Sequence, residues 1–377
     1  MRRATLGFVF LLAACSSTSS TTKPPITSST STASTTSAPH VVKQPGGRVT
    51  DIYAADHAGR LSPVVRGDRS LVYVPNSKSD TVDVIDPSTD KIVEHFAVGR
   101  LPQHVVPAWD LKTLYVTNDQ GNTLTPIDPR TGKPGALIPV EDPYNMYFTP
   151  DGKYAIVVAE RLARLDFRDP HTFKLVQSIP VGCRGVDHMD FSADNTYLIA
   201  SCEFSGDMIK VDLRTKTVVG RLHLPGASKP QDVKLDPAGR VFYVADLIHA
   251  GVFLLDGVTM RVIGFVHTGA GAHGLYVSRD SKVLYVTNRG EGTISLIDFV
   301  TRRVVKTWNV GGSPDMGGVS ADGNILWVSS RGTGQLLKID TRSGRLLDSI
   351  RVGAQPHGVC VFPQPGRYSL GHTGIYR

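Results

Sequence analysis

The chain has 377 residues, of which 41% are hydrophobic and 20% charged, and its formal net charge is +7. This composition agrees with a single globular domain that carries a polar tail. The basic residues are scattered through turns without a dense run, so we expect no nucleic-acid partner.

Residues 1–14 read as a signal peptide. Arg2 and Arg3 precede a short apolar run that is too short to span a bilayer as a mature helix. Leu12-Ala13-Ala14-Cys15 resembles a bacterial lipobox, which implies cleavage before Cys15 and attachment of lipid, with palmitate, to the Cys15 thiol. An ordinary signal peptide with an incidental Cys15 is the alternative. The arginine pair leaves both twin-arginine and general secretory export open.

Residues 15–40 begin with the lipidated cysteine and are dominated by Ser and Thr. A segment with so little apolar surface cannot offset the entropy of ordering, so we expect a disordered tether. At roughly 5–6 Å × √n, such a tether reaches a few nanometres. The sequence therefore predicts a monomer anchored to the cell membrane and facing its extracytoplasmic side. Its further partner would be a small ligand or an envelope protein.

Residues 41–377 contain a sequence motif that recurs about every 42 residues. Each copy has a large apolar side chain in what we expect to be the second strand of the repeat. Its seven copies are centred on Tyr73, Tyr115, Ile156, Ile199, Tyr243, Tyr285 and Trp327. Each repeat has room for four short strands with alternating polarity, and Gly and Pro gather in the connections. Such an array predicts an all-β fold, a seven-bladed β-propeller of four-stranded antiparallel blades with short terminal extensions.

The two ends of the array must meet to close a ring. The run from Gly358 to Phe362 has no complete repeat after it, while the first repeat, around Tyr73, needs an inner strand. Pairing the two would remove an open sheet edge. Val64-Val65 could compete for that inner position. The segment 368–372 looks like a fragment of a further repeat, which leaves eight blades as the alternative to seven.

The residues of these repeats carry a resemblance to a known family. Tyr115-Val116-Thr117-Asn118 and Tyr285-Val286-Thr287-Asn288 match the signature of the YVTN-repeat β-propellers, and Pro150-Asp151-Gly152-Lys153 matches that family's turn. The resemblance covers residues 60–365 and implies the architecture of surface-layer and periplasmic propeller proteins. More distant relatives include haem-binding and copper-binding propellers, so the resemblance does not imply one activity.

Superimposing the repeats gives two neighbouring polar columns at the starts of the inner strands, nearest the expected mouth of the central channel. The ligand-binding candidates in these columns are Gln103, His104, Asp187, His188, Asp232, His273, Asp315 and His357. Loops on the same rim add Arg184, Arg289 and Arg331, and an arginine there can clamp a carboxylate or phosphate. The alternative is that the loop charges are merely solvated and that the polar columns bind channel water and neighbouring blades.

Histidines dominate these columns and suggest a metal site. His104, His188, His273 and His357 each lie two repeats apart, and neutral imidazole is a ligand for copper and zinc, which are the possible cofactors. Neighbouring positions of a strand face opposite ways. All four rings can therefore reach the channel only if bulges shift the strand register.

Three cysteines lie within the repeats. Cys183 precedes the inner strand of the fourth repeat and Cys202 ends its second strand, which places both on one rim. In an oxidising compartment these two are candidates for a disulfide. Two free thiols, or a metal site that includes His188, are the alternatives. Cys360 lies in an apolar run and is expected to pack in the core.

Three classes of function remain open, because the sequence carries no local catalytic motif. The first is a non-catalytic lipoprotein that binds a ligand or protein partner on the channel-mouth rim. The second is a copper- or zinc-dependent oxidoreductase with histidine ligands at the channel mouth. The third is a lyase or lactonase with a histidine base such as His273 or His357.

Overall fold

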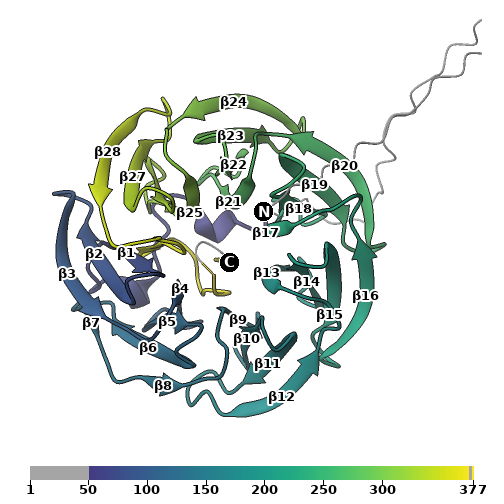
Figure 1. The fold of residues 1–377 in the computed structure, drawn as a ribbon, viewed down its shortest axis with the longest axis horizontal. Helices are drawn as coiled ribbons and strands as arrows, with labels where there is room; N and C mark the ends of the chain where they lie inside the picture. Colours follow the sequence, from purple (N-terminus) through teal and green to yellow (C-terminus); the bar gives the residue numbers. More distant parts are fainter. Residues whose placement is uncertain (1–50, 373–375) are drawn as a thin grey trace, which may run out of the picture. The chain divides into compact units, whose positions relative to one another are not determined.

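The computed structural model describes residues 51–372 and 376–377, so the expected signal peptide and tether lie outside the described residues. The described part is a ring of seven sheets around a central axis (Figure 1). This confirms the predicted all-β, seven-bladed propeller with four-stranded antiparallel blades. Within the described ranges, helical structure is confined to two short 3-10 turns, η1 (Ala54–Asp56) and η2 (Pro63–Val65). No helix there is long and apolar enough to cross a membrane.

The blades follow one another in chain order, and each runs from the axis outward. Blade 1 contains β29 (Cys360–Phe362), β1 (Leu71–Asn76), β2 (Thr81–Asp86) and β3 (Lys91–Ala97). Blade 2 contains β4 (Pro102–Pro107), β5 (Leu114–Asn118), β6 (Thr123–Asp128), β7 (Lys133–Pro134) and β8 (Ile138–Pro139). Blade 3 contains β9 (Asn145–Phe148), β10 (Ala155–Ala159), β11 (Arg164–Arg168) and β12 (Leu175–Pro180).

The remaining four blades repeat the same order. Blade 4 contains β13 (Val186–Phe191), β14 (Tyr197–Cys202), β15 (Asp207–Asp212) and β16 (Thr217–His223). Blade 5 contains β17 (Pro230–Leu235), β18 (Val241–Asp246), β19 (Gly251–Asp256) and β20 (Arg261–His267). Blade 6 contains β21 (Ala272–Val277), β22 (Val283–Asn288), β23 (Thr293–Asp298) and β24 (Arg303–Asn309). Blade 7 contains β25 (Pro314–Val319), β26 (Ile325–Ser330), β27 (Gln335–Asp340) and β28 (Leu346–Arg351).

The recurring large residue of each second strand explains why the repeats pack. All seven of these side chains, from Tyr73 to Trp327, are buried and fill the space between neighbouring blades. The fourth strands lie at the outside, and in β16 half-buried and exposed residues alternate. In blade 2 the outer strand is split into β7 and β8, because Pro134 and Pro139 have no N–H to donate and Gly135 lies between them.

The ring closes through its C-terminal strand, as predicted. β29 pairs antiparallel with β1, with Tyr73 opposite Cys360 and Leu71 opposite Phe362. The alternative inner strand at Val64-Val65 is wrong, because these residues form η2, whose Ser62 side chain accepts the Val64 N–H. The first sheet therefore has no open inner edge, and chain ends far apart in sequence are held in one blade.

The segment after β29 does not begin an eighth blade. It turns back into the centre of the ring, where Gly371 forms an antiparallel bridge with Tyr147 of β9. The Leu370 carbonyl accepts the Phe148 N–H at 2.9 Å, and the His372 N–H donates to the Met146 carbonyl at 3.2 Å. These contacts place the segment against the inner strand of blade 3, and the pairing of β29 with β1 already closes the ring with seven blades. We call residues 363–372 the C-terminal segment.

Candidate functional site

The starts of the inner strands form two stacked layers around the axis, with a rim above them. The upper layer contains Gln103, Tyr144, Asp187, Gln231, His273, Asp315 and His357. The lower layer contains His104, Asn145, His188, Asp232, Gly274, Met316 and Gly358. The rim positions, which directly follow the second strands, are Ser77, Asp119, Glu160, Glu203, Leu247, Arg289 and Arg331. Every layer thus takes one residue from each blade.

Bulges at the strand starts bring both layers to the axis. The pairing register of the inner strand shifts between Pro102 and His104, between Val186 and Met189, and between Ala272 and Leu275. The inner strands of blades 5 and 7 shift in the same way. Neighbouring residues that would face opposite ways in a regular strand can then both point inward. The bulges on which the histidine prediction depended are therefore present.

The four predicted histidines approach one another, but they do not form one compact set. The ring centroids of His104 and His357 lie 4.9 Å apart, and those of His188 and His273 lie 6.4 Å apart. His273 and His357 belong to the upper layer and contact Asp315. Among the described residues, the three rings with nitrogens within 4.8 Å of one another are instead His104, His188 and His372, and the repeat columns did not contain His372.

Asp315 is the centre of a basic side of the site. His357 Nδ1 lies 2.7 Å from one carboxylate oxygen, and His273 Nδ1 lies 3.3 Å from the other. From the rim, Arg289 reaches Asp315 at 2.9 Å and Arg331 reaches it at 3.6 Å. One carboxylate thus faces two guanidinium groups, which leaves an excess of positive charge. Both arginine side chains are about a quarter exposed, at 27% and 25%.

These contacts fix the protonation states on the basic side. Burial alone would raise the pKa of Asp315, but His273, His357 and Arg289 outweigh it and hold the pKa well below its usual range. Burial lowers the pKa of His273 to about 3 and that of His357 to about 4, although Asp315 opposes both shifts. At neutral pH the carboxylate is therefore ionised and both imidazoles are neutral.

Blades 3 and 4 form an acidic side of the same site. Burial, followed by the charges of Asp119 and Glu203, raises the pKa of Glu160 to about 8. Burial, followed by the charge of Glu203, raises the pKa of Asp187 well above its usual range. The pKa of Glu203 is also raised by burial, although Lys229 opposes the shift. Carboxyl groups that resist ionisation because they crowd together favour the approach of a cation.

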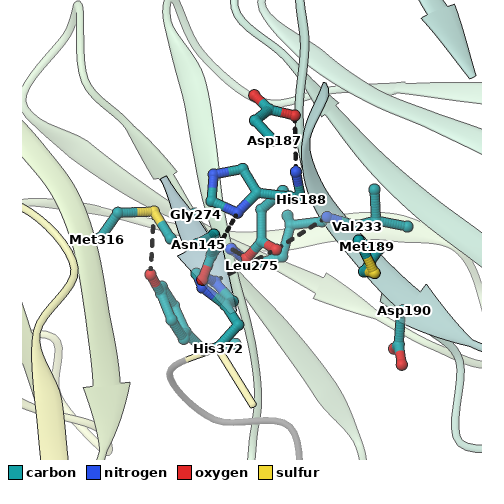
Figure 2. A network of polar contacts seen from close by, with 12 residues as sticks. Asn145, Asp187, His188, Met189, Asp190, Val233, Gly274, Leu275, Met316 and His372 are labelled. Atoms are coloured by element: carbon teal, nitrogen blue, oxygen red, sulfur yellow. Dashed lines mark hydrogen bonds and ion pairs between the residues drawn. The ribbon is translucent and has the colours of Figure 1, made fainter. Parts of the chain in front are cut away.

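The lower layer contains a fully buried polar cluster at the axis. The amide nitrogen of Asn145 lies 3.2 Å from His188 Nδ1 and 3.3 Å from His372 Nδ1, and Figure 2 shows Asn145 between these two rings. Asp232 accepts the N–H groups of Val233 and Leu275 at 2.9 Å. Burial would raise the pKa of Asp232, but Lys234 and His372 lower it. The cluster therefore combines neutral imidazoles with an ionised carboxylate.

The remaining predicted residues make contacts outside the two charged groups described above. Gln103 is buried, with its side-chain oxygen 3.4 Å from the Ser77 hydroxyl. Arg184 is exposed and donates to the Phe204 carbonyl at 3.3 Å. Cys183 and Cys202 form a disulfide with an S–S distance of 2.05 Å, and it joins the rim loop of blade 4 to the strand that precedes Glu203.

The site is more enclosed than an open channel mouth. His104, Asp187, His188, Asp232 and Asp315 are fully buried, and the contact with solvent is made through the half-buried rim residues above them. A surface cleft of about 580 Å³ lies at the opposite rim, next to Thr149, Asp151 and Arg214, and no residue of the three layers lines it. A ligand would therefore meet the rim arginines and glutamates first.

Glu160 and Glu203 were not among the predicted residues, because a single glutamate in a loop has no distinguishing pattern. Their importance arises from the crowding with Asp187, which only the ring geometry creates. His372 was missed because it comes from the C-terminal segment and not from a repeat column. In the sequence, His372 is marked only by its position beyond the last complete repeat.

Solved structures support the architecture. The hydrazine synthase of Kuenenia stuttgartiensis matches with 19% identity and a TM-score of 0.64, over 74% of this chain and 94% of that one. A functionally unknown protein from Desulfotomaculum acetoxidans matches with 18% identity and a TM-score of 0.66, over 78% and 98%. Dihydro-heme d1 dehydrogenase NirN, solved in complex with DHE, matches with 16% identity and a TM-score of 0.60, over 85% and 82%. At these identities the likeness concerns the fold alone.

Sequence comparison assigns the family. No curated protein matched this chain. A family model for the YNCE-like β-propeller matches residues 55–367, which is nearly the whole of the described ring. This agrees with the repeat signature, the seven blades and the closure by β29. The chain belongs to the YNCE-like β-propeller family.

Proposed function

We propose that this protein is a membrane-anchored, extracytoplasmic lipoprotein whose propeller binds a small zwitterionic ligand at the rim. The observation that carries the proposal is the separation of acidic from basic side chains across one site. The rim positions of blades 2–4 are Asp119, Glu160 and Glu203, whereas those of blades 6 and 7 are Arg289 and Arg331. A ligand with a cationic and an anionic group would match both sides at once.

Each side has a physical reason to accept a charge. On the acidic side, a ligand ammonium group would let Glu160 and Asp187 ionise, which burial and the neighbouring carboxyl groups now oppose. On the basic side, Arg289 and Arg331 share Asp315 and keep further N–H donors toward the rim, so a carboxylate or phosphate could be bound bidentately. The neutral His273 and His357 hold Asp315 in place beneath them.

Residues before the ring support the place of action. The lipobox-like Leu12-Ala13-Ala14-Cys15 and the Ser/Thr-rich stretch after it would hold the rim near a membrane surface by a lipid and a tether. The disulfide in blade 4 suits an oxidising compartment. A binding protein tethered in this way would collect a solute beside the membrane.

Native mass spectrometry of the full chain tests the proposal. The protein would be incubated with a panel of free amino acids and dipeptides, together with their N-acetylated and C-amidated derivatives. We expect complexes with zwitterionic members only, and loss of those complexes in both Glu203→Gln and Arg289→Gln. Arg342→Gln, on the opposite rim, is the matched control. Equal occupancy by the singly charged derivatives, or unchanged occupancy in both rim variants, would refute the proposal.

A further inference from the structure

Three imidazoles converge at the axis below the rim. His104 comes from blade 2, His188 from blade 4 and His372 from the C-terminal segment, and each offers a nitrogen that lies within 4.8 Å of the others. All three side chains are fully buried. Their ring centroids are 5.5, 5.0 and 4.8 Å apart. A tetrahedral ion with metal–nitrogen bonds of about 2.0–2.1 Å would hold the centroids of its imidazole ligands about 5 Å apart.

The free nitrogens give the second observation. Both nitrogens of His104 and the Nε2 atoms of His188 and His372 are buried without a hydrogen-bond partner. Buried polar atoms without a partner are rare in native proteins, because each loses its contact with water. Each of the three rings therefore has at least one unpartnered nitrogen, and burial keeps the rings neutral, which is the form that binds metals.

We propose that His104, His188 and His372 bind a single zinc or copper ion, and that this ion fastens the C-terminal segment into the centre of the propeller. Neutral imidazole suits both metals. The ion would join blades 2 and 4, which flank blade 3, to a segment that bonds to the backbone of blade 3, packs Leu370 into the core and stacks Tyr368 on Trp109. This site is separate from the rim, and it does not depend on the proposed ligand.

The surroundings of the site define what binding requires. An ion on Nε2 of His188 and His372 leaves both Nδ1 atoms protonated, so Asn145 must turn its side-chain oxygen toward them. That oxygen now accepts the Met146 N–H at 2.8 Å, and this bond would be given up. Asp232 supplies negative charge 3.6 Å from His372 Nε2, while the buried Lys234 opposes a cation there.

Metal analysis of the full chain, produced without a polyhistidine tag, tests the proposal. The protein would be loaded separately with zinc sulfate and with copper sulfate, freed of excess metal, and analysed by plasma mass spectrometry. We expect about one ion per chain of at least one of the two metals, and an affinity at least about 100-fold lower in His372→Ala. His372 lies outside the blade strands, so this variant should keep the ring intact. His223→Ala, at the surface, is the matched control and should bind like the wild type.

Hydrogen exchange provides the second readout. The amides of the C-terminal segment should exchange faster when the ion is removed with a chelator, and the same treatment should change nothing in His372→Ala. Wild-type protein that holds neither metal, or a His372→Ala variant that holds as much as the wild type, would overturn the site. A stoichiometric ion whose removal leaves exchange in the segment unchanged would overturn its fastening role.

Discussion

The separation of acidic from basic side chains across the site can be tested by making the same substitution, Asp to Asn, at two positions. Asp315 and Asp187 occupy equivalent positions of the upper layer, in blades 7 and 4, and both are fully buried. Asp315 contacts two arginines and His357, whereas Asp187 has acidic neighbours and no basic partner within salt-bridge distance among the described residues. Replacing each aspartate by asparagine removes the ionisable group without changing the shape of the side chain.

The two variants should differ widely in stability. Breaking a buried ion pair by removing one partner costs about 3–5 kcal/mol, and the lower end applies to Asp315→Asn because both arginines can still turn to water. A loss of about 3 kcal/mol corresponds to a fall in Tm of roughly 4–5 °C for a domain of this size. Asp187→Asn should change the free energy of unfolding by less than about 1 kcal/mol, because its raised pKa means that the acid is already largely neutral.

Chemical denaturation followed by tryptophan fluorescence, with calorimetry for Tm, gives both values. We expect the free energy of unfolding of Asp315→Asn to be lower than that of Asp187→Asn by about 2 kcal/mol or more. Equal losses in the two variants would show that the carboxylates occupy similar electrostatic environments. A larger loss in Asp187→Asn would reverse the assignment of the acidic and basic sides.

Three further predictions concern other parts of the protein. Deleting everything after Gly353 removes β29 and exposes the edge of β1. Sedimentation should then show aggregation, or thermal scans a Tm far below that of the full chain, whereas an unchanged Tm would contradict closure of the ring by β29. Cys15→Ser should move the protein out of the membrane fraction or leave it unprocessed, and a variant that fractionates and migrates like the wild type would rule out lipidation there. His357→Asn should remove a pH-dependent contribution to the free energy of unfolding. The pKa of His357 is about 4 in the folded protein and about 6.5 in the unfolded chain, so the wild type loses stability as the pH falls. Between pH 7.5 and 5.5 this loss should be about 1.4 kcal/mol larger in the wild type than in the variant. Denaturation curves at the two pH values measure this difference, and parallel curves for both proteins would show that His357 titrates normally.

The sequence was sufficient for the architecture because the repeat is a local signal. The large residue near the middle of each second strand has the same buried role in every blade, so its spacing counts the blades. Closure was also predictable, because the run at Gly358–Phe362 lacked a partner and the first repeat lacked an inner strand. The aspartates that end the third strands cap turns: Asp298 accepts the Thr301 N–H, and Asp340 accepts the N–H groups of Arg342 and Ser343.

The site was only partly predictable, because its chemistry depends on which blades face one another. The columns identified Asp315, His273 and His357, but adjacent strand positions were expected to face opposite ways, and only the bulges bring His104 and His188 to the axis. The third ring of the lower cluster, His372, arrives from outside the repeats. Repeat spacing carries no information on how a terminal segment folds back, so this contact could not be derived from the pattern.

The central claim is that the rim binds both charges of one small ligand, and calorimetric titration of the full chain tests it most directly. The strongest binder among the amino acids and dipeptides would be titrated alongside its N-acetylated and C-amidated forms. We predict that losing either charge weakens binding at least about tenfold, which is about 1.4 kcal/mol. A derivative with one charge that binds as tightly as the parent zwitterion would contradict the account.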